Sequence, residues 1–226
     1  MRFEQGANAD LERFLSGLQP KHPLRVILEG EHWDAEAGRL LASAPAGMNF
    51  RFLSVRGAPF GDEGIALLAA APMLASVQTL CLERCGITDA GVAQLAASPY
   101  VRELRQLFLC NRAGVETGFP NTIGESGALA LAMSPNLGRL EELDLWNTSV
   151  GDRGVETLIA SPNLWRLSQL TVWATRLTEE GANRAKALVM EQWERTRDSA
   201  RPRTICSIHT DYDERSISYS DDGGFG

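Results

Sequence analysis

The feature that most constrains the fold is a repeat of 27 residues, which runs through most of the 226-residue chain. Pairs of apolar residues separated by one residue recur at intervals of 27, with one interval of 36. These pairs are Val26/Leu28, Leu53/Val55, Leu80/Leu82, Leu107/Leu109, Leu143/Leu145 and Leu170/Val172. A proline series and a glycine series share this spacing: Pro45, Pro72, Pro99, Pro135 and Pro162, and Gly64, Gly91, Gly127, Gly154 and Gly181. Three series with one common nine-residue insertion indicate stacked structural units.

Each unit is predicted to contain a short strand followed by a turn and a helix. The apolar pair places two side chains on one face of a strand. A step such as Thr88-Asp89-Ala90-Gly91 follows, in which threonine suits a helix N-cap and the acid suits the first helical turn. The glycine should let the start of the helix lie close to the strand layer. A Ser-Pro or Ala-Pro pair ends the helix, because the residue before proline avoids the helical region.

The pattern L-x-x-L-x-L-x-x-N/C/T-x-I/V, over about residues 23 to 190, resembles a leucine-rich repeat. The G-D-x-G and L-A-x-S-P steps are similar to those of the ribonuclease-inhibitor-like class in its bacterial form. The resemblance implies an α/β leucine-rich-repeat solenoid of about six repeats, with a parallel sheet on the concave face and helices on the convex face. Gly127-Ala128-Leu129-Ala130 also resembles the GALA-type effectors, which implies an alternative role as an effector or ubiquitin-ligase adaptor. The F-box pattern that precedes such repeats is not seen in this sequence.

The chain is expected to have three parts. Residues 1–22 form an N-terminal cap with a helix over 7–18, residues 23–196 hold the repeats, and residues 197–226 form a C-terminal segment. Within that segment, residues 203–219 are interpreted as a hairpin, with a floppy tail as the alternative, and the end is expected to be disordered. Val189 stands where the next proline is expected, so the last repeat helix should be longer than the others.

The nine-residue insertion falls within 112–122, where a strand leaves for its helix. This position predicts a loop on one rim of the stack, and loops of this kind often carry partner contacts. The alternative is a neutral insertion, since added loop length costs little free energy.

The candidate binding site lies on the strand residues between the core leucines, because these point to the other face of the sheet. Neighbouring strands are about 4.8 Å apart, so Phe108, Trp146 and Trp173 should lie side by side. The polar residues expected around them are Gln106, Glu142, Asp144, Asn147 and Gln169. Aromatic residues ringed by polar ones are typical of interface hot spots, and the acids suggest a partner with basic or amide groups. The alternatives are that the C-terminal segment covers Trp173 or that the rings only stack on each other.

No motif for catalysis, metal binding or a cofactor is found in the sequence. The three histidines occur in no HExxH or His/Cys ligand spacing, and there is no phosphate-binding glycine loop. Cys85 falls where leucine-rich repeats place Asn or Cys to bond the backbone, and Cys81 lies on a strand. His209 with Asp211 and Asp213 is interpreted as a hydrophilic hairpin tip rather than a metal site. We therefore expect a non-catalytic protein-interaction module, with a hydrolase or a repeat protein without a specific partner as alternatives.

Composition and charge limit the kinds of partner that this chain is expected to bind and the cellular compartment in which it is expected. The formal net charge of −7, without a basic block, makes nucleic acid or an anionic membrane a poor candidate partner. No apolar run reaches the roughly 18 residues of a membrane span, and the first residues lack the apolar stretch of a secretory signal. The four cysteines have no disulfide-like spacing, which favours a reducing cytoplasm. The expected partner is a protein of unknown identity.

Overall fold

The computed structural model describes residues 2–3, 8–17, 23–45, 47–112, 118–196, 207–209 and 217–218. These residues form an α/β protein with six parallel strands that pair in sequence order. The strands are β2 (Leu24–Glu29), β3 (Phe50–Arg56), β4 (Thr79–Glu83), β5 (Gln106–Phe108), β6 (Glu142–Asp144) and β7 (Gln169–Thr171). Seven α-helices alternate with them in the described residues: α1 (Asn8–Ser16), α2 (Ala35–Ala42), α3 (Gly61–Ala69), α4 (Asp89–Ala97), α5 (Glu125–Met133), α6 (Asp152–Ala160) and α7 (Glu179–Thr196). A 3₁₀ helix, η1 (Pro72–Ser76), precedes β4.

Short strands extend the sheet at both edges. At one edge β1 (Arg2–Phe3) pairs parallel to β2, and at the other β8 (Ser207–His209) pairs parallel to β7. β9 (Ile217–Ser218) is antiparallel to β8, and both strands lie within the predicted hairpin 203–219. The turn of that hairpin and residues 219–226 lie outside the described residues.

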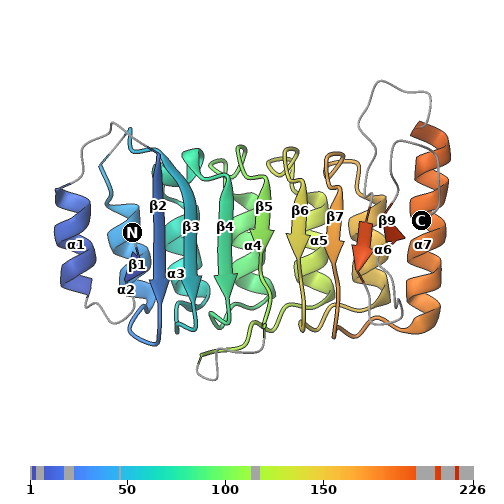
Figure 1. The fold of residues 1–226 in the computed structure, drawn as a ribbon, viewed down its shortest axis with the longest axis horizontal. Coiled ribbons are helices and arrows are strands. Elements are labelled where there is room, and N and C mark those ends of the chain that lie inside the picture. The colour runs from blue at the N-terminus through green and yellow to red at the C-terminus, as the bar shows by residue number, and fades with distance from the viewer. Residues whose placement is uncertain are drawn as a thin grey trace.

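The helices cover one face of the sheet and leave the other face, here called the open face, toward the viewer in Figure 1. The predicted cap helix is α1, whose Leu11 and Leu15 are buried, although residues 7 and 18 lie outside the described residues. α7 has 18 residues where α3 to α6 have nine each, so the predicted long last helix is confirmed.

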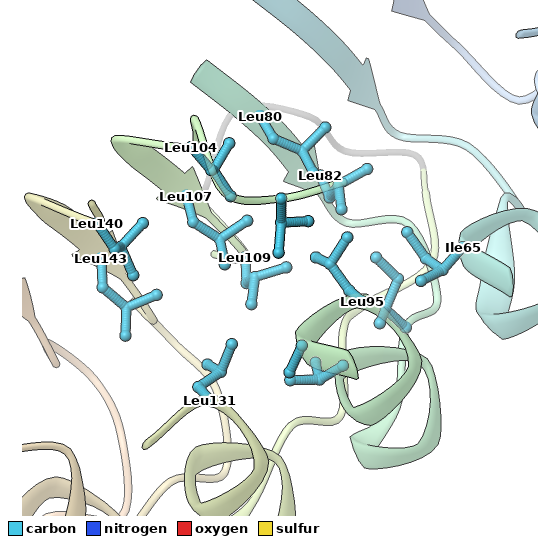
Figure 2. Close-up of a cluster of buried hydrophobic side chains, with 14 of the residues drawn as sticks. Ile65, Leu80, Leu82, Leu95, Leu104, Leu107, Leu109, Leu131, Leu140 and Leu143 are labelled. Carbon is cyan, nitrogen blue, oxygen red and sulfur yellow. The ribbon is translucent and has the colours of Figure 1, made fainter. Parts of the chain in front are cut away.

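The core lies between the sheet and the helices. Every residue of the six apolar pairs is buried, as their period predicts. In Figure 2 leucines from β4 and from β5 and the residue after it point toward Leu95 of α4 and Leu131 of α5. Burial of each such side chain contributes about 1.5–3 kcal/mol to stability. Because alternate strand residues face this core, the residues between them face the open side.

The aspartates in the first turns of the repeat helices accept hydrogen bonds from the unit that follows. Asp62 accepts hydrogen bonds from the backbone N–H of Thr88 (2.8 Å) and from its hydroxyl (2.6 Å). Asp89 accepts from the N–H of Gly124 (2.7 Å), and Asp152 accepts from the N–H of Thr178 (2.8 Å). The predicted N-cap is also present, since the Thr88 hydroxyl accepts from the N–H of Ala90 at 3.1 Å. These acids therefore stabilise contacts between units as well as the first turn of a helix.

The repeated glycines make room for these acids. A Cβ atom at Gly91 would lie 2.3 Å from Oδ1 of Asp62, and one at Gly181 would lie 2.1 Å from Oδ1 of Asp152. At Gly127 the distance to Oδ1 of Asp89 would be 2.6 Å. At Gly64 and Gly154 the nearest atoms instead belong to Phe60 and Val150, which lie between the strand and the helix of the same unit. The glycines therefore allow close contact both with the preceding unit and within their own unit.

The Ser-Pro pairs also connect neighbouring units. Ser98 has the extended ψ of 129° expected before proline, so the predicted helix end is confirmed there. Its hydroxyl donates to the carbonyl of Ala69 at the end of α3 (2.5 Å). Ser134 and Ser161 make the same bond to the ends of α4 and α5. Both ends of a helix are therefore held by the preceding unit.

Candidate binding surface on the open face of the sheet

The strand register aligns the predicted site residues in columns. Gln106 pairs with Glu142 and Glu142 with Gln169, and one column further Phe108 pairs with Asp144. The columns predicted from the 27-residue spacing are therefore confirmed for these strands. Trp146 and Trp173 follow their strands, and the N–H of Asn147 donates to the carbonyl of Trp173 (2.7 Å), which makes the two tryptophans neighbours.

Two hollows lie on this face, and they divide the predicted site. The first, the arginine hollow, has a volume of about 530 Å³ and is lined by Arg25, Phe52, Arg56, Thr79, Cys81, Glu83, Gln106, Phe108, Cys110 and Arg112. The second, the tryptophan hollow, has a volume of about 350 Å³ and is lined by Arg112, Trp146, Thr171 and Trp173. Phe108 lines the arginine hollow, and the two tryptophans line the tryptophan hollow. Arg112 lines both hollows and joins them.

Arg112 is held by a buried carboxylate. Asp144 is 1% exposed, its Oδ2 accepts from Nη2 of Arg112, and its Oδ1 accepts from the N–H of Trp146 at 2.9 Å. The guanidinium carbon lies 5.5 Å from the Trp146 ring centroid, within range of a cation–π contact. The hydrogen bond to Asp144 raises the pKa of Arg112. Asp144 is therefore buried beneath the open face, rather than exposed around the aromatic side chains as expected, and it positions Arg112 above it.

Three of the other predicted polar residues, Gln106, Glu142 and Asn147, have side-chain hydrogen bonds. The Thr79 hydroxyl donates to Oε1 of Gln106 (2.8 Å), and Nε2 of Gln106 donates to Oε2 of Glu142 (2.7 Å). Asn147 is exposed, has a φ of 55°, and donates from Nδ2 to the carbonyl of Asn111 (3.3 Å). Gln169 is exposed beside Glu142. Side chains that are already ordered in this way lose little conformational entropy when a partner binds.

A second arginine lies above a second buried acid. Glu83 is 5% exposed, and its Oε2 lies 3.4 Å from Nε of Arg56. Burial raises the pKa of Glu83, and the nearby Arg56 opposes that shift. Arg25 places its guanidinium 3.8 Å from the ring centroid of Phe52. The open face therefore presents guanidinium groups and rings beside the partly exposed carboxylate of Glu142.

The buried thiols are in their protonated form at neutral pH. Burial raises the pKa of Cys110 to about 12, and it raises the pKa values of Cys81 and Cys85 as well. The Cys85 thiol donates to the carbonyl of Val55 (3.1 Å), as expected for its loop position. The thiolate is the form that attacks or binds metals, so these groups are poor nucleophiles. Among the described residues, no group of three His, Cys, Asp or Glu side chains could hold a metal ion, and Asp211 and Asp213 lie outside them.

The insertion returns to the stack through Asn121. This residue is buried, its Oδ1 accepts from the N–H groups of Cys85 and Ile87 (both 3.0 Å), and its Nδ2 donates to the carbonyls of Leu82 (2.7 Å) and Leu109 (3.0 Å). Asn121 stands 36 residues after Cys85, so the extra residues are 112–120. Arg112 is therefore the first inserted residue. Sequence reasoning missed it as a site residue, although an arginine beside an acid of the neighbouring strand was a signal that could have found it.

Comparison with known proteins adds no family to this description. The chain matches no protein-family model, and no curated protein is similar to it in sequence. None of the helices in the described ranges is both long enough and apolar enough to cross a membrane. The fold and the two hollows together define an α/β protein of repeated β-α units with a candidate binding surface on its open face.

Proposed function

We propose that this chain is a leucine-rich-repeat solenoid of the ribonuclease-inhibitor-like class, and that it is a non-catalytic protein-interaction module. Its binding site is the open face, which is the concave face of such a solenoid. This assignment is supported by the apolar pairs, by the parallel sheet with helices on one side, and by the backbone contacts of Cys85 after β4 and Asn121 after β5.

The observation that carries the functional proposal is the exposed tryptophan pair. Trp173 is 44% exposed and Trp146 is half-buried, and both line one hollow with Arg112. Tryptophan and arginine are the residues most enriched among interface hot spots. Because the surrounding polar side chains are already held by hydrogen bonds, a partner meets a preorganised surface and binding loses little ordering entropy.

Affinity purification with the wild-type chain and with the Trp146→Ala/Trp173→Ala variant tests the proposal. Trp165 supplies a matched control, because it is 36% exposed and lines neither hollow. A protein that is retained by the wild type and by Trp165→Ala but lost by the double variant is the expected result. Circular dichroism must show that all three chains are folded. Equal retention by all three would place the binding site away from the tryptophan hollow and refute the proposal.

A further inference from the structure

The arginine hollow has a surface chemistry unlike that of the whole chain, whose net charge is −7. The side chains of Arg56 and Arg112 are 42% and 52% exposed, whereas those of Glu83 and Asp144 are 7% and 1% exposed. The formal charges of these two pairs cancel, so the difference is one of depth. Hydrogen-bond donors face the solvent and the carboxylates lie beneath them.

The buried acids hold the two guanidiniums in place. Each guanidinium has five N–H donors, and one carboxylate cannot accept all of them. Arg112 is bound to Asp144 through Nη2, and Arg56 lies beside Glu83. Both side chains are partly exposed and line the hollow, next to the ring of Phe108. Planar guanidiniums fixed in this way match the geometry of a carboxylate.

We propose that the arginine hollow binds an acidic side chain, Asp or Glu, of the protein partner. An apolar side chain of the same extended segment lies in the tryptophan hollow, because Arg112 joins the two hollows. This inference rests on the proposed function, since it assigns a chemistry to the partner that the open face binds.

The positions of the two hollows also determine the spacing between the acidic and the apolar side chain of the recognised segment. The arginine hollow is lined by residues of and next to β2 to β5, and the tryptophan hollow by residues of and next to β6 and β7. The middles of these two groups of strands are separated by three strand spacings, about 14 Å, which corresponds to about four residues of extended chain. The recognised segment therefore carries an acid and an aromatic or branched apolar residue about four positions apart.

A displayed library of random linear peptides, selected on the full-length wild-type chain, tests the inference. The expected result is enrichment of an acidic residue at this spacing from an apolar one. A selection in which no acidic position is enriched overturns the inference.

Double-mutant cycles between peptide and protein then show which arginine contacts the acidic residue of the peptide. In a selected peptide, Glu→Gln (or Asp→Asn) should weaken binding about tenfold, the factor expected for a charge-assisted hydrogen bond. The same peptide change should have a smaller effect on at least one of three protein variants: Arg25→Gln, Arg56→Gln/Glu83→Gln and Arg112→Gln/Asp144→Asn. The paired changes remove each ion pair without leaving a buried charge alone. Arg153→Gln, at an exposed position of α6, is the control for general charge effects and should leave the tenfold loss unchanged.

The two proposals fail in different ways. Peptides that are lost by Trp146→Ala/Trp173→Ala but show no coupling to any of the three arginine variants leave the proposed function standing and overturn the acidic anchor. Peptides that bind the tryptophan variant and the wild type equally well overturn the proposed site, and with it this inference.

Discussion

Replacing Gly181 by alanine should destabilise the fold, although this change normally stabilises a helix by about 1 kcal/mol. The three heavy atoms nearest to a Cβ at this position all belong to the Asp152 carboxyl group, and the nearest is 2.1 Å away. The carboxylate must therefore move from the position in which it accepts from the N–H and the hydroxyl of Thr178, both at 2.8 Å.

The size of the effect follows from the hydrogen bonds that are lost. A hydrogen bond to a charged group contributes about 1.5–3 kcal/mol, and the lower end applies to a partly exposed carboxylate such as Asp152. Two such bonds contribute about 3 kcal/mol, so after subtraction of the helix preference of alanine Gly181→Ala should lower the free energy of unfolding by about 2 kcal/mol. In the Asp152→Ala background the carboxylate is absent, and the same glycine change should raise that free energy by up to about 1 kcal/mol.

Urea denaturation of the wild type, both single variants and the double variant, followed by circular dichroism, measures this change of sign. The coupling energy of the cycle isolates the contact between the two positions. If Gly181→Ala stabilises the wild type, or has the same effect in both backgrounds, the steric explanation of the repeated glycine is refuted.

Four further predictions follow from residues of the stack and the site. Trp146→Ala should change the free energy of unfolding by less than about 1 kcal/mol, because the ring is only half-buried, and urea denaturation checks this. Asn121→Ala should lower it by about 3 kcal/mol or more, because buried N–H and carbonyl groups lose their partners; a loss below about 1 kcal/mol would contradict this. The Thr178 N–H holds the pKa of Asp152 below its ordinary value of 3.8, so the carboxylate stabilises the fold above that pH. This contribution is lost as the pH falls through the lower folded-state pKa, and acid denaturation of Asp152→Asn should lack it. Cys110, with its pKa raised to about 12, should resist iodoacetamide in the native chain at neutral pH and react once urea unfolds it, as mass spectrometry would show.

Much of the fold could be predicted from the sequence, because a constant spacing determines which residues are neighbours. Once Leu80, Leu107 and Leu143 are aligned, the strand order and the columns on the open face follow, and the structure has this register. The period also separates the core side of each strand from the open side. The alternation of residues along a strand, however, shows only which face of the sheet a side chain is on, and not how deeply it is buried.

The depth of Asp144 could not be predicted for a physical reason. It is buried because Arg112 covers it, and Arg112 belongs to the insertion, which has no counterpart in the other units. The contact of the glycines with the preceding unit was missed for a related reason. Asp62 and Gly91 belong to different units, and their contact appears only when the units are stacked in three dimensions.

The side-chain bonds that join the helix ends of neighbouring units have a common direction, whereas the backbone bonds of the sheet, such as that from the Asn147 N–H to the Trp173 carbonyl, also run the other way. In the contacts of Asp62, Asp89 and Asp152 and in those of Ser98, Ser134 and Ser161, the later unit donates the hydrogen and the earlier unit accepts it. During synthesis the amino-terminal units leave the ribosome first, so each new helix meets acceptors that are already in place. At the helix ends, removal of a carboxyl-terminal unit exposes carboxylate and carbonyl acceptors, whereas removal of an amino-terminal unit leaves the donors of the next helix start without their protein partners. Shortening the stack from its two ends should therefore expose different groups of the helix layer.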